Sequence, residues 1–196
     1  MSYNIYTTRG LVLSARPLRE ADRLYSVLTK DLGLIYARAL GVRKEASKLR
    51  GNLEPFSLVH VSLVRGQVQW RVTSASLIAP ASVFDHKKSM LRSLVRGFSL
   101  LERLVQGEEK HPELFEAVEE VFNFALSDEA VAGSEEPLEM ILVARLLHHL
   151  GYLSSKDIPE EILCGELHQE HLVKARENKK KLIEVINHGL LNTDLT

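Results

Sequence analysis

The chain has 196 residues, 45% of them hydrophobic, which is enough to bury at least one sizeable core. No apolar run reaches the ~20 residues of a membrane-spanning helix, and the first residues lack the basic and apolar regions of a signal peptide, so we expect a cytoplasmic protein. The single cysteine, Cys164, excludes an intramolecular disulfide and a four-cysteine metal site within one chain.

The net charge of −1 conceals two halves of opposite charge. Residues 1–80 contain 12 Lys and Arg against 5 Asp and Glu, whereas residues 81–196 contain 13 against 21. A basic half favours contact with the phosphates of nucleic acid, and the acidic half is expected to have a different function. We therefore expect one domain over 1–80 and a second over 81–196.

The first domain is predicted to consist of five short strands. Strands are expected over 3–13 and 24–29, where β-branched and aromatic residues gather, and over 34–42, 56–64 and 67–73, where side chains alternate between two faces.

Two glycines mark irregular positions among these strands. Gly10 is expected at a bulge or a sharp bend, and Arg65 and Gly66 are expected to form a tight hairpin turn. Five antiparallel strands in about 80 residues predict a small closed barrel of the OB type, with an SH3-like barrel as the alternative.

The second domain is predicted to be helical. Beyond a hinge rich in Ser, Ala and Pro over 74–82, the apolar period changes from two to about 3.6 residues. The spacing predicts a long helix over 83–106, a second that begins at Pro112, a third over 137–151, and one or two polar helices over 159–191. The expected fold class is therefore α+β: an N-terminal antiparallel five-stranded OB-type β-barrel followed by an α-helical domain.

A basic loop lies between the third and fourth predicted strands. It carries four cations and the single acid Glu45; the cations are Arg43, Lys44, Lys48 and Arg50. Cations on a flexible, solvated loop suit phosphate oxygens, although an ordinary solvated loop is the alternative. Other candidate DNA-binding cations of this domain are Arg16, Arg19, Arg23, Arg38 and Arg71.

Two aromatic side chains are candidates for stacking on bases, which stabilises single-strand complexes. Tyr36, next to a candidate cation on the third strand, is the better one. Trp70 shares its predicted face with Val68 and Val72, so we assign it to the core.

Two stretches of the chain resemble the family of the bacterial recombination mediator RecO: YTTRGLVLSARPLREADRLYSVLTKDLG, and GVRKEASKLRGNLEPFSLV with its basic loop and Leu-x-Gly-x-Leu-x-Pro-Phe-like pattern. Weaker similarities are LLERLVQGEEKHPELFEAVEE and ARLLHHLGYL. The resemblance implies an OB fold that binds single- and double-stranded DNA, anneals complementary strands and helps to load the recombinase RecA. It also implies two partners: the ring-forming protein RecR and the acidic tail of single-stranded DNA-binding protein.

The chain departs from this family in three respects. Tyr36 and Leu40 stand where the family often has cations, the cysteines of the family's zinc module are absent, and the C-terminal part is expected to be shorter than usual.

A second candidate site lies on the long predicted helix. Arg92, Arg96 and Arg103 stand near Phe98, and cations beside apolar surface would suit an acidic peptide. The alternative is a helix that packs on the barrel and keeps these cations in water.

Neither catalysis nor a metal is expected. No Ser/His/Asp set, glycine-rich phosphate loop or Walker-type lysine occurs at a usable spacing, so we predict a protein without enzymatic activity or cofactor. Cys164, His168 and His171 have the spacing of one helical face, but a structural zinc site requires a fourth ligand, and no obviously placed one lies nearby. We therefore predict no zinc.

These observations predict a DNA-binding mediator of recombinational repair, located in the cytoplasm at the nucleoid. An OB-fold RNA-binding or ribosome-associated protein is the alternative, because its barrel would carry the same charge. A pure protein-interaction module is the third hypothesis.

Overall fold

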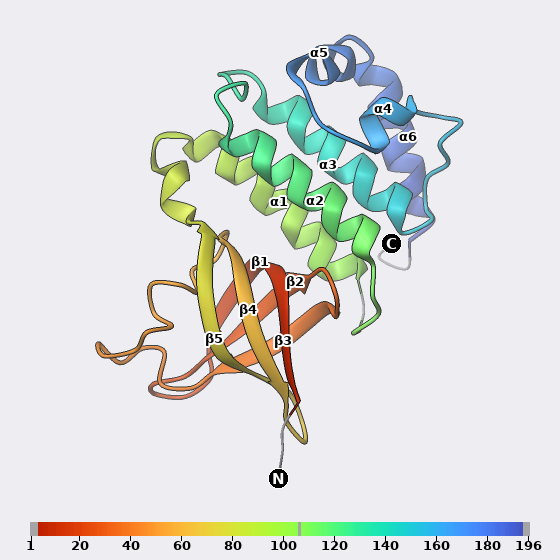
Figure 1. Cartoon of the computed structure of the whole chain (residues 1–196). Coiled ribbons are helices and arrows are strands. Elements are labelled where there is room, and N and C mark those ends of the chain that lie inside the picture. Colours follow the sequence, from red (N-terminus) through yellow and green to blue (C-terminus); the bar gives the residue numbers. More distant parts are fainter. Residues whose placement is uncertain (1–3, 106, 194–196) are drawn as a thin grey trace. The chain divides into compact units, whose positions relative to one another are not determined.

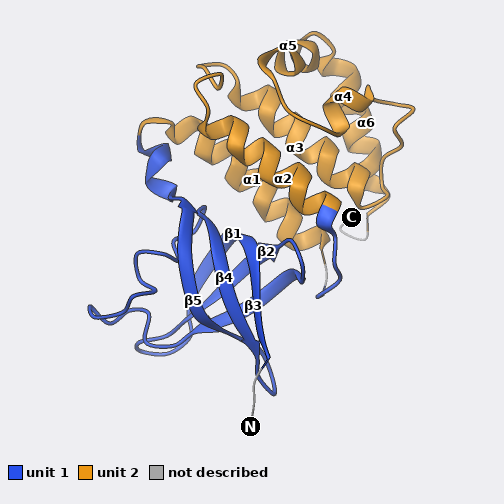
Figure 2. Cartoon of the chain, in the orientation of Figure 1, with its two compact units in different colours: residues 1–85, 106–112 blue, residues 86–105, 113–196 orange. Residues whose placement is uncertain are grey.

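The computed structural model describes residues 4–105 and 107–193 and divides the chain into two compact units (Figures 1 and 2). Unit 1 comprises residues 1–85 and 106–112, and unit 2 comprises residues 86–105 and 113–196. Unit 1 is a β-barrel and unit 2 is helical. The predicted start of the first strand, Tyr3, and the predicted end of the first helix, Gln106, lie outside the described residues.

The barrel of unit 1 closes in the order β1-β2-β3-β5-β4, with β4 returning to β1. Its strands are β1 (Ile5–Pro17), β2 (Arg23–Thr29), β3 (Gly33–Ala39), β4 (Leu58–Arg65) and β5 (Trp70–Ala79). The predicted α+β class with an OB-type barrel is confirmed, with one difference: β3 and β5 pair in parallel, whereas the other pairs are antiparallel. This strand order is that of the OB fold and not of an SH3-like barrel.

The interior of the barrel is filled by alternate residues of its strands. Ile35, Ala37 and Ala39 of β3 are fully buried, as predicted. The predicted inner face of β4 is confirmed in the same way, by Val59, Val61 and Leu63. Each buried Val, Leu or Ile stabilises the folded state by roughly 1.5–3 kcal/mol relative to an exposed one.

The turn between β4 and β5 differs from the prediction. Strand β5 begins at Trp70, so residues 66–69 form a connection in which Gly66 N donates to Gln69 O at 3.1 Å. Val68, expected on the inner face, is therefore 95% exposed at this turn. The predicted strand start at residue 67 and the predicted two-residue hairpin are both wrong.

Strand β1 pairs with both β2 and β4, and the two pairings overlap at Gly10. This residue faces Thr29 of β2 and Val59 of β4, and a Cβ added to it would lie 2.7 Å from Val27 Cγ1. The register shift of β1 falls between Val12 and Ser14, so the predicted bulge is displaced from Gly10. The glycine instead permits a close approach of side chains inside the barrel.

A carboxylate joins the start of β2 to the end of β3. Asp22 Oδ1 accepts from Gly41 N at 2.7 Å, and its Oδ2 accepts from Arg38 Nε at 3.1 Å. The Gly41 N–H, followed by the Arg38 guanidinium, holds the pKa of Asp22 below its ordinary value. We call this group of Asp22, Arg38 and Gly41 the carboxylate clasp.

Unit 2 consists of helices packed around α3. A 3-10 helix, η1 (Ala81–His86), precedes α1 (Lys88–Leu104), α2 (Pro112–Leu126), α3 (Glu135–His149), α4 (Glu160–Leu163), α5 (Gln169–Glu177) and α6 (Lys179–Leu191). The predicted start of the second helix at Pro112 is confirmed, whereas the first begins later than expected. The region expected to hold one or two helices contains three.

Two contacts of α3 set the packing of unit 2. A Cβ added to Gly97 of α1 would lie 2.3 Å from Leu142 Cδ2, so the glycine lets α1 approach α3 closely. Arg145 is 0% exposed, and it donates from Nε to Ile162 O at 2.9 Å and from Nη2 to Gly165 O at 3.0 Å. Burial lowers the pKa of Arg145, and the charge of Glu120 opposes this shift.

We expect Gly97→Ala to destabilise the protein by about 1 kcal/mol, because the overpacking penalty of roughly 1–3 kcal/mol exceeds the gain in helix propensity of up to about 1 kcal/mol. Thermal unfolding measures the effect. Gly51→Ala is the matched control, because a Cβ at Gly51 meets no atom within 4 Å. An equal loss in both variants would contradict the role of the close contact with Leu142.

The carboxylate clasp predicts a pH dependence of stability. Because the folded pKa of Asp22 lies below its ordinary value of 3.8, its contribution is complete above that value and is lost as the pH falls through the folded pKa. Asp22→Asn should therefore be less stable than the parent at neutral pH, and the difference in melting temperature should shrink in acid. A difference that stays constant from neutral pH into this acidic range would refute the assignment.

Candidate nucleic-acid interface

An open hollow of about 570 Å³ lies on the barrel where β3, β4 and β5 meet. It carries three guanidinium groups, those of Arg38, Arg65 and Arg71, and no described Asp or Glu lines it. The remaining lining residues are Leu40, Val64, Gly66, Gln67, Val68, Gln69 and Trp70. This combination of cations, amide groups and apolar side chains suits a polyanion that also presents flat bases.

Strand pairing positions the three arginines. In the parallel register of β3 and β5, Arg38 lies opposite Arg71, so both point to the same face of the sheet. Arg65 ends β4 and pairs with Trp70 at the start of β5. The structure thus brings together two predicted residues, Arg38 and Arg71, with one that the sequence analysis missed.

The three arginines differ in how far a neighbouring carboxylate neutralises their charge. Arg38 is held by Asp22 in the carboxylate clasp, so part of its charge is neutralised. Arg65 Nη2 lies 3.3 Å from Glu108 Oε2, and both side chains are largely exposed, so this pair is weak. Arg71 is exposed. Arg71 and Arg65 are therefore better placed than Arg38 to take up a phosphate.

Trp70 belongs to the core, as the sequence analysis favoured. Its side chain is 4% exposed, the Tyr6 ring packs against it edge to face at 5.4 Å, and the Arg65 guanidinium lies 5.5 Å from the ring centre. These contacts cover the indole. Tyr36, at 48% exposure, and Tyr6 are the aromatic side chains left accessible to a base in this region of the described barrel.

The basic loop is ordered by successive turns and is not the flexible tether expected from the sequence. Backbone N–H groups of Lys44, Ser47, Arg50 and Asn52 each donate to the carbonyl three residues earlier, at 3.0–3.2 Å. Three apolar residues join the loop to the barrel core, namely Val42, Leu49 and Leu53. All four predicted cations stay exposed on it.

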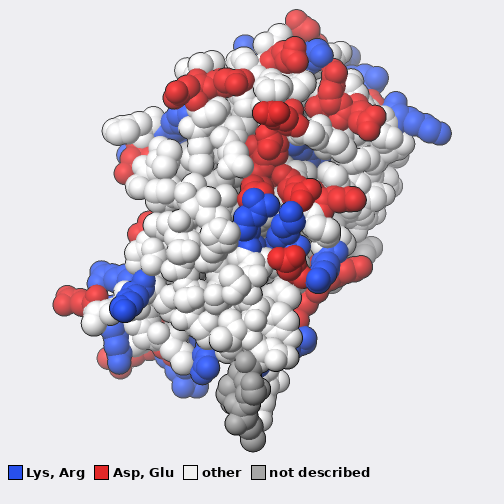
Figure 3. All heavy atoms as spheres, viewed as in Figure 1, with Lys and Arg blue, Asp and Glu red and all other residues white. Residues whose placement is uncertain are grey.

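Two hydrogen bonds of Arg43, one from its backbone and one from its side chain, connect the basic loop to the turn between β1 and β2. Arg43 N donates to Ala21 O at 3.1 Å, and Arg43 Nη1 donates to Glu20 O at 2.9 Å. The exposed Arg16 and Arg19 flank or lie within this turn, and the half-buried Arg23 follows it. In Figure 3 Lys and Arg side chains gather over the loops at this end of unit 1. We call the hollow, the basic loop and this turn together the basic face.

Sequence reasoning missed Arg65, Gln67 and Gln69 because residues 65–69 were assigned to a tight turn and the next strand. A usable signal was present: the segment RGQVQ contains a cation and two amides with only one apolar side chain. Such a composition is typical of an exposed loop.

The predicted acidic-peptide dock on α1 needs correction. Phe98 is 1% exposed, so it is buried and offers no surface to a peptide. Arg96 donates from Nε to Glu139 Oε1 at 2.6 Å, which neutralises much of its charge. Arg92 and Arg103 are exposed but have lost the apolar partner on which the prediction relied.

The three candidate zinc ligands do not share a helix. Cys164 follows α4 in extended backbone, His168 caps α5, and His171 lies inside α5 with its Nδ1 accepting from His168 N at 3.0 Å. The described residues contain no group of three or more His, Cys, Asp and Glu placed to hold a metal ion. The absence of zinc stays a prediction. None of the described helices is both long and apolar enough to cross a membrane.

Comparison with known proteins agrees with this architecture. Residues 1–81 match a family model described as "Recombination protein O N terminal". The chain is 33% identical over 150 residues to "DNA repair protein RecO" of Frankia casuarinae, a match that covers 74% of this chain and 58% of that protein.

A second protein of the same name, from Synechococcus, is 46% identical over 67 residues, 34% of this chain and 24% of that protein. The matches thus span less than two thirds of either relative's length. The match over the barrel, together with the longer alignment that continues beyond the barrel's length, shows that the chain belongs to the RecO family.

Proposed function

We propose that this chain is a non-enzymatic DNA-binding mediator of recombinational repair. In this role it binds single- and double-stranded DNA, anneals complementary strands and assists recombinase loading. The observation that carries the proposal is the basic face, where Leu40 of the arginine-lined hollow leads directly into an ordered loop with four exposed cations. The name of both relatives, "DNA repair protein RecO", supports the assignment to repair.

The basic face suits binding that ignores base sequence. Lys and Arg side chains neutralise phosphates and release condensed counterions, which acts equally on any sequence. On single strands, Tyr36 adds a stacking surface worth roughly 1–3 kcal/mol per base. Annealing follows from the same charge, because cations between two strands reduce the repulsion that keeps complementary phosphate chains apart.

An OB-fold RNA-binding protein remains the competing hypothesis, because the basic face does not by itself distinguish ribose from deoxyribose. An RNA binder should prefer folded RNA, partly through contacts to the 2′-OH. A mediator should bind both forms of DNA and accelerate the annealing of complementary oligonucleotides. Annealing measured with DNA and with RNA strands of the same sequence separates the two, and a pure protein-interaction module would bind neither.

Two protein partners belong to the proposal through the family resemblance: a ring-forming RecR-like protein and the tail of a single-stranded DNA-binding protein. The dock predicted for the acidic tail is not retained, because Phe98 is buried. No surface is assigned to the RecR-like protein. A protein with these tasks would act at the nucleoid in the cytoplasm, without a cofactor.

Binding to DNA should depend steeply on salt. If roughly four to six phosphates are neutralised, log K against log salt should have a slope of about −3 to −5. Fluorescence anisotropy of a labelled oligonucleotide over a series of salt concentrations measures the slope. A slope near zero would rule out the basic face as the source of affinity.

Replacing Arg43, Lys44, Lys48 and Arg50 together by alanine should weaken DNA binding by the order of 10- to 100-fold for all sequences alike. The melting temperature should change little, because exposed charges contribute little to folding. The salt slope should become shallower at the same time, since fewer counterions are released.

The control variant removes the same charge from exposed positions of unit 2: Arg103, Lys156, Lys180 and Lys181 are replaced by alanine. It should retain the DNA affinity of the parent. Equal losses in both variants would show that net charge, and not the basic loop, determines binding.

A further inference from the structure

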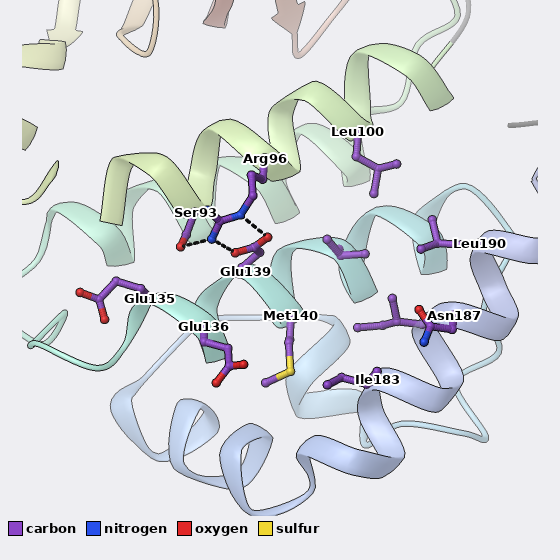
Figure 4. Close-up of a pocket in the computed structure, with 12 residues that line it drawn as sticks. Ser93, Arg96, Leu100, Glu135, Glu136, Glu139, Met140, Ile183, Asn187 and Leu190 are labelled. Carbon is purple, nitrogen blue, oxygen red and sulfur yellow. Dashed lines mark hydrogen bonds and ion pairs between the residues drawn. The ribbon is translucent and has the colours of Figure 1, made fainter. Parts of the chain in front are cut away.

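A groove of about 560 Å³ runs between α1, α3 and α6 of unit 2 (Figure 4). Ser93, Arg96 and Leu100 line it from α1. The lining residues of α3 are Glu135, Glu136, Glu139, Met140 and Val143, and those of α6 are Ile183, Ile186, Asn187 and Leu190. The groove is distinct from the basic face, which lies on unit 1.

The greater part of the groove is apolar. Six aliphatic side chains line it, two from α3, one from α1 and three from α6: Met140, Val143, Leu100, Ile183, Ile186 and Leu190. Ile183 is 36% exposed although it has an apolar side chain. An apolar groove of this kind, bounded by helices, matches the surface that receives an amphipathic helix in helix-in-groove recognition.

The other part of the groove is acidic. Figure 4 shows Glu135 and Glu136 at one end of the groove, and Leu100 and Leu190 at the opposite end. Arg96 is the single cation among the described lining residues, and it is paired with Glu139 and bonded to Ser93 Oγ. Glu139 neutralises this guanidinium, so Glu135 and Glu136 are the two carboxylates left without a cation among the described lining residues.

Glu135 stays ionised at neutral pH. Hydrogen bonds from Ser89 Oγ and from backbone N–H groups, including Gly133 N, lower the pKa of Glu135. Glu136 lies 2.6 Å from Lys179 Nζ, but its side chain is 62% exposed, so this pair screens only part of its charge. The acidic end of the groove thus repels anions and attracts cations.

We propose that this groove binds an amphipathic helix of a partner protein that carries an apolar ridge and ends in Lys or Arg. The apolar ridge would cover the aliphatic side chains of α1, α3 and α6, and the basic end would lie against Glu135 and Glu136. An acidic peptide would meet like charges at this end, which disfavours binding. A helix of about three turns is long enough to fill the groove, because the lining covers roughly two to three turns of each helix, from Glu135 to Val143 on α3.

Two synthetic peptides test the proposal. The first is an amphipathic helix of about four turns with leucines at i, i+3, i+4 and i+7 spacing and lysines in its last turn. The second has glutamates in place of these lysines. Fluorescence anisotropy with the full chain should show a Kd for the lysine peptide at least 10-fold lower than for the glutamate peptide. Equal binding, preference for the glutamate peptide, or no binding would overturn the proposal.

Paired variants locate the site. Ile183→Asp in the groove should weaken binding of the lysine peptide at least 10-fold, whereas Val173→Asp, at a similarly exposed apolar residue of α5 outside the groove lining, should not. Glu136→Lys should weaken it more than Glu184→Lys, which makes the same charge change outside the groove lining. If Ile183→Asp fails to fold, the Glu136 and Glu184 pair still decides the question. Equal effects within either pair of folded variants would refute the groove as the site.

Discussion

Closure of the barrel is the constraint on which the arrangement of unit 1 depends. Strand β1 has to pair with β2 along one part and with β4 along another, and the two sets of partners meet at Gly10, where a side chain would collide with Val27. The second closing contact is the short parallel pairing of β3 with β5, which sets Arg38 opposite Arg71. The same pairing that completes the hydrogen bonds of the sheet therefore creates the arginine-lined hollow.

Order in the basic loop comes mainly from its apolar residues and its backbone turns. Four like-charged side chains in one short loop repel each other, so the loop requires attachment that does not depend on charge. Three apolar side chains supply it by packing on the barrel core, and Arg43 adds one backbone and one side-chain hydrogen bond to the neighbouring turn. The carboxylate clasp joins the strand ends beside the loop. Cations held in this way lose less conformational entropy when they bind phosphate.

The hollow on unit 1 is lined by cations, whereas carboxylates predominate among the charged residues of the groove on unit 2. The two surfaces therefore suit ligands of opposite charge. Under the proposed function, DNA would be attracted by the arginines of the hollow and repelled by the carboxylates of the groove on unit 2. A basic helix has the reverse preference. If both proposals hold, each surface would discriminate against the ligand of the other through charge.

Local patterns in the sequence determined the order of the strands, the helical character of the second half and the charge of each half, because alternation, period and composition are read within a few residues. Ile35, Ala37 and Ala39 were therefore assigned correctly to the core. Local patterns did not determine the start of β5 or the number of C-terminal helices. Tertiary structure alone decided two other features. The parallel register of β3 and β5 pairs Arg38 with Arg71, and the packing of the chain buries Phe98. A helical period shows that Phe98 lies on an apolar face, but whether that face is covered depends on tertiary packing and not on the local sequence.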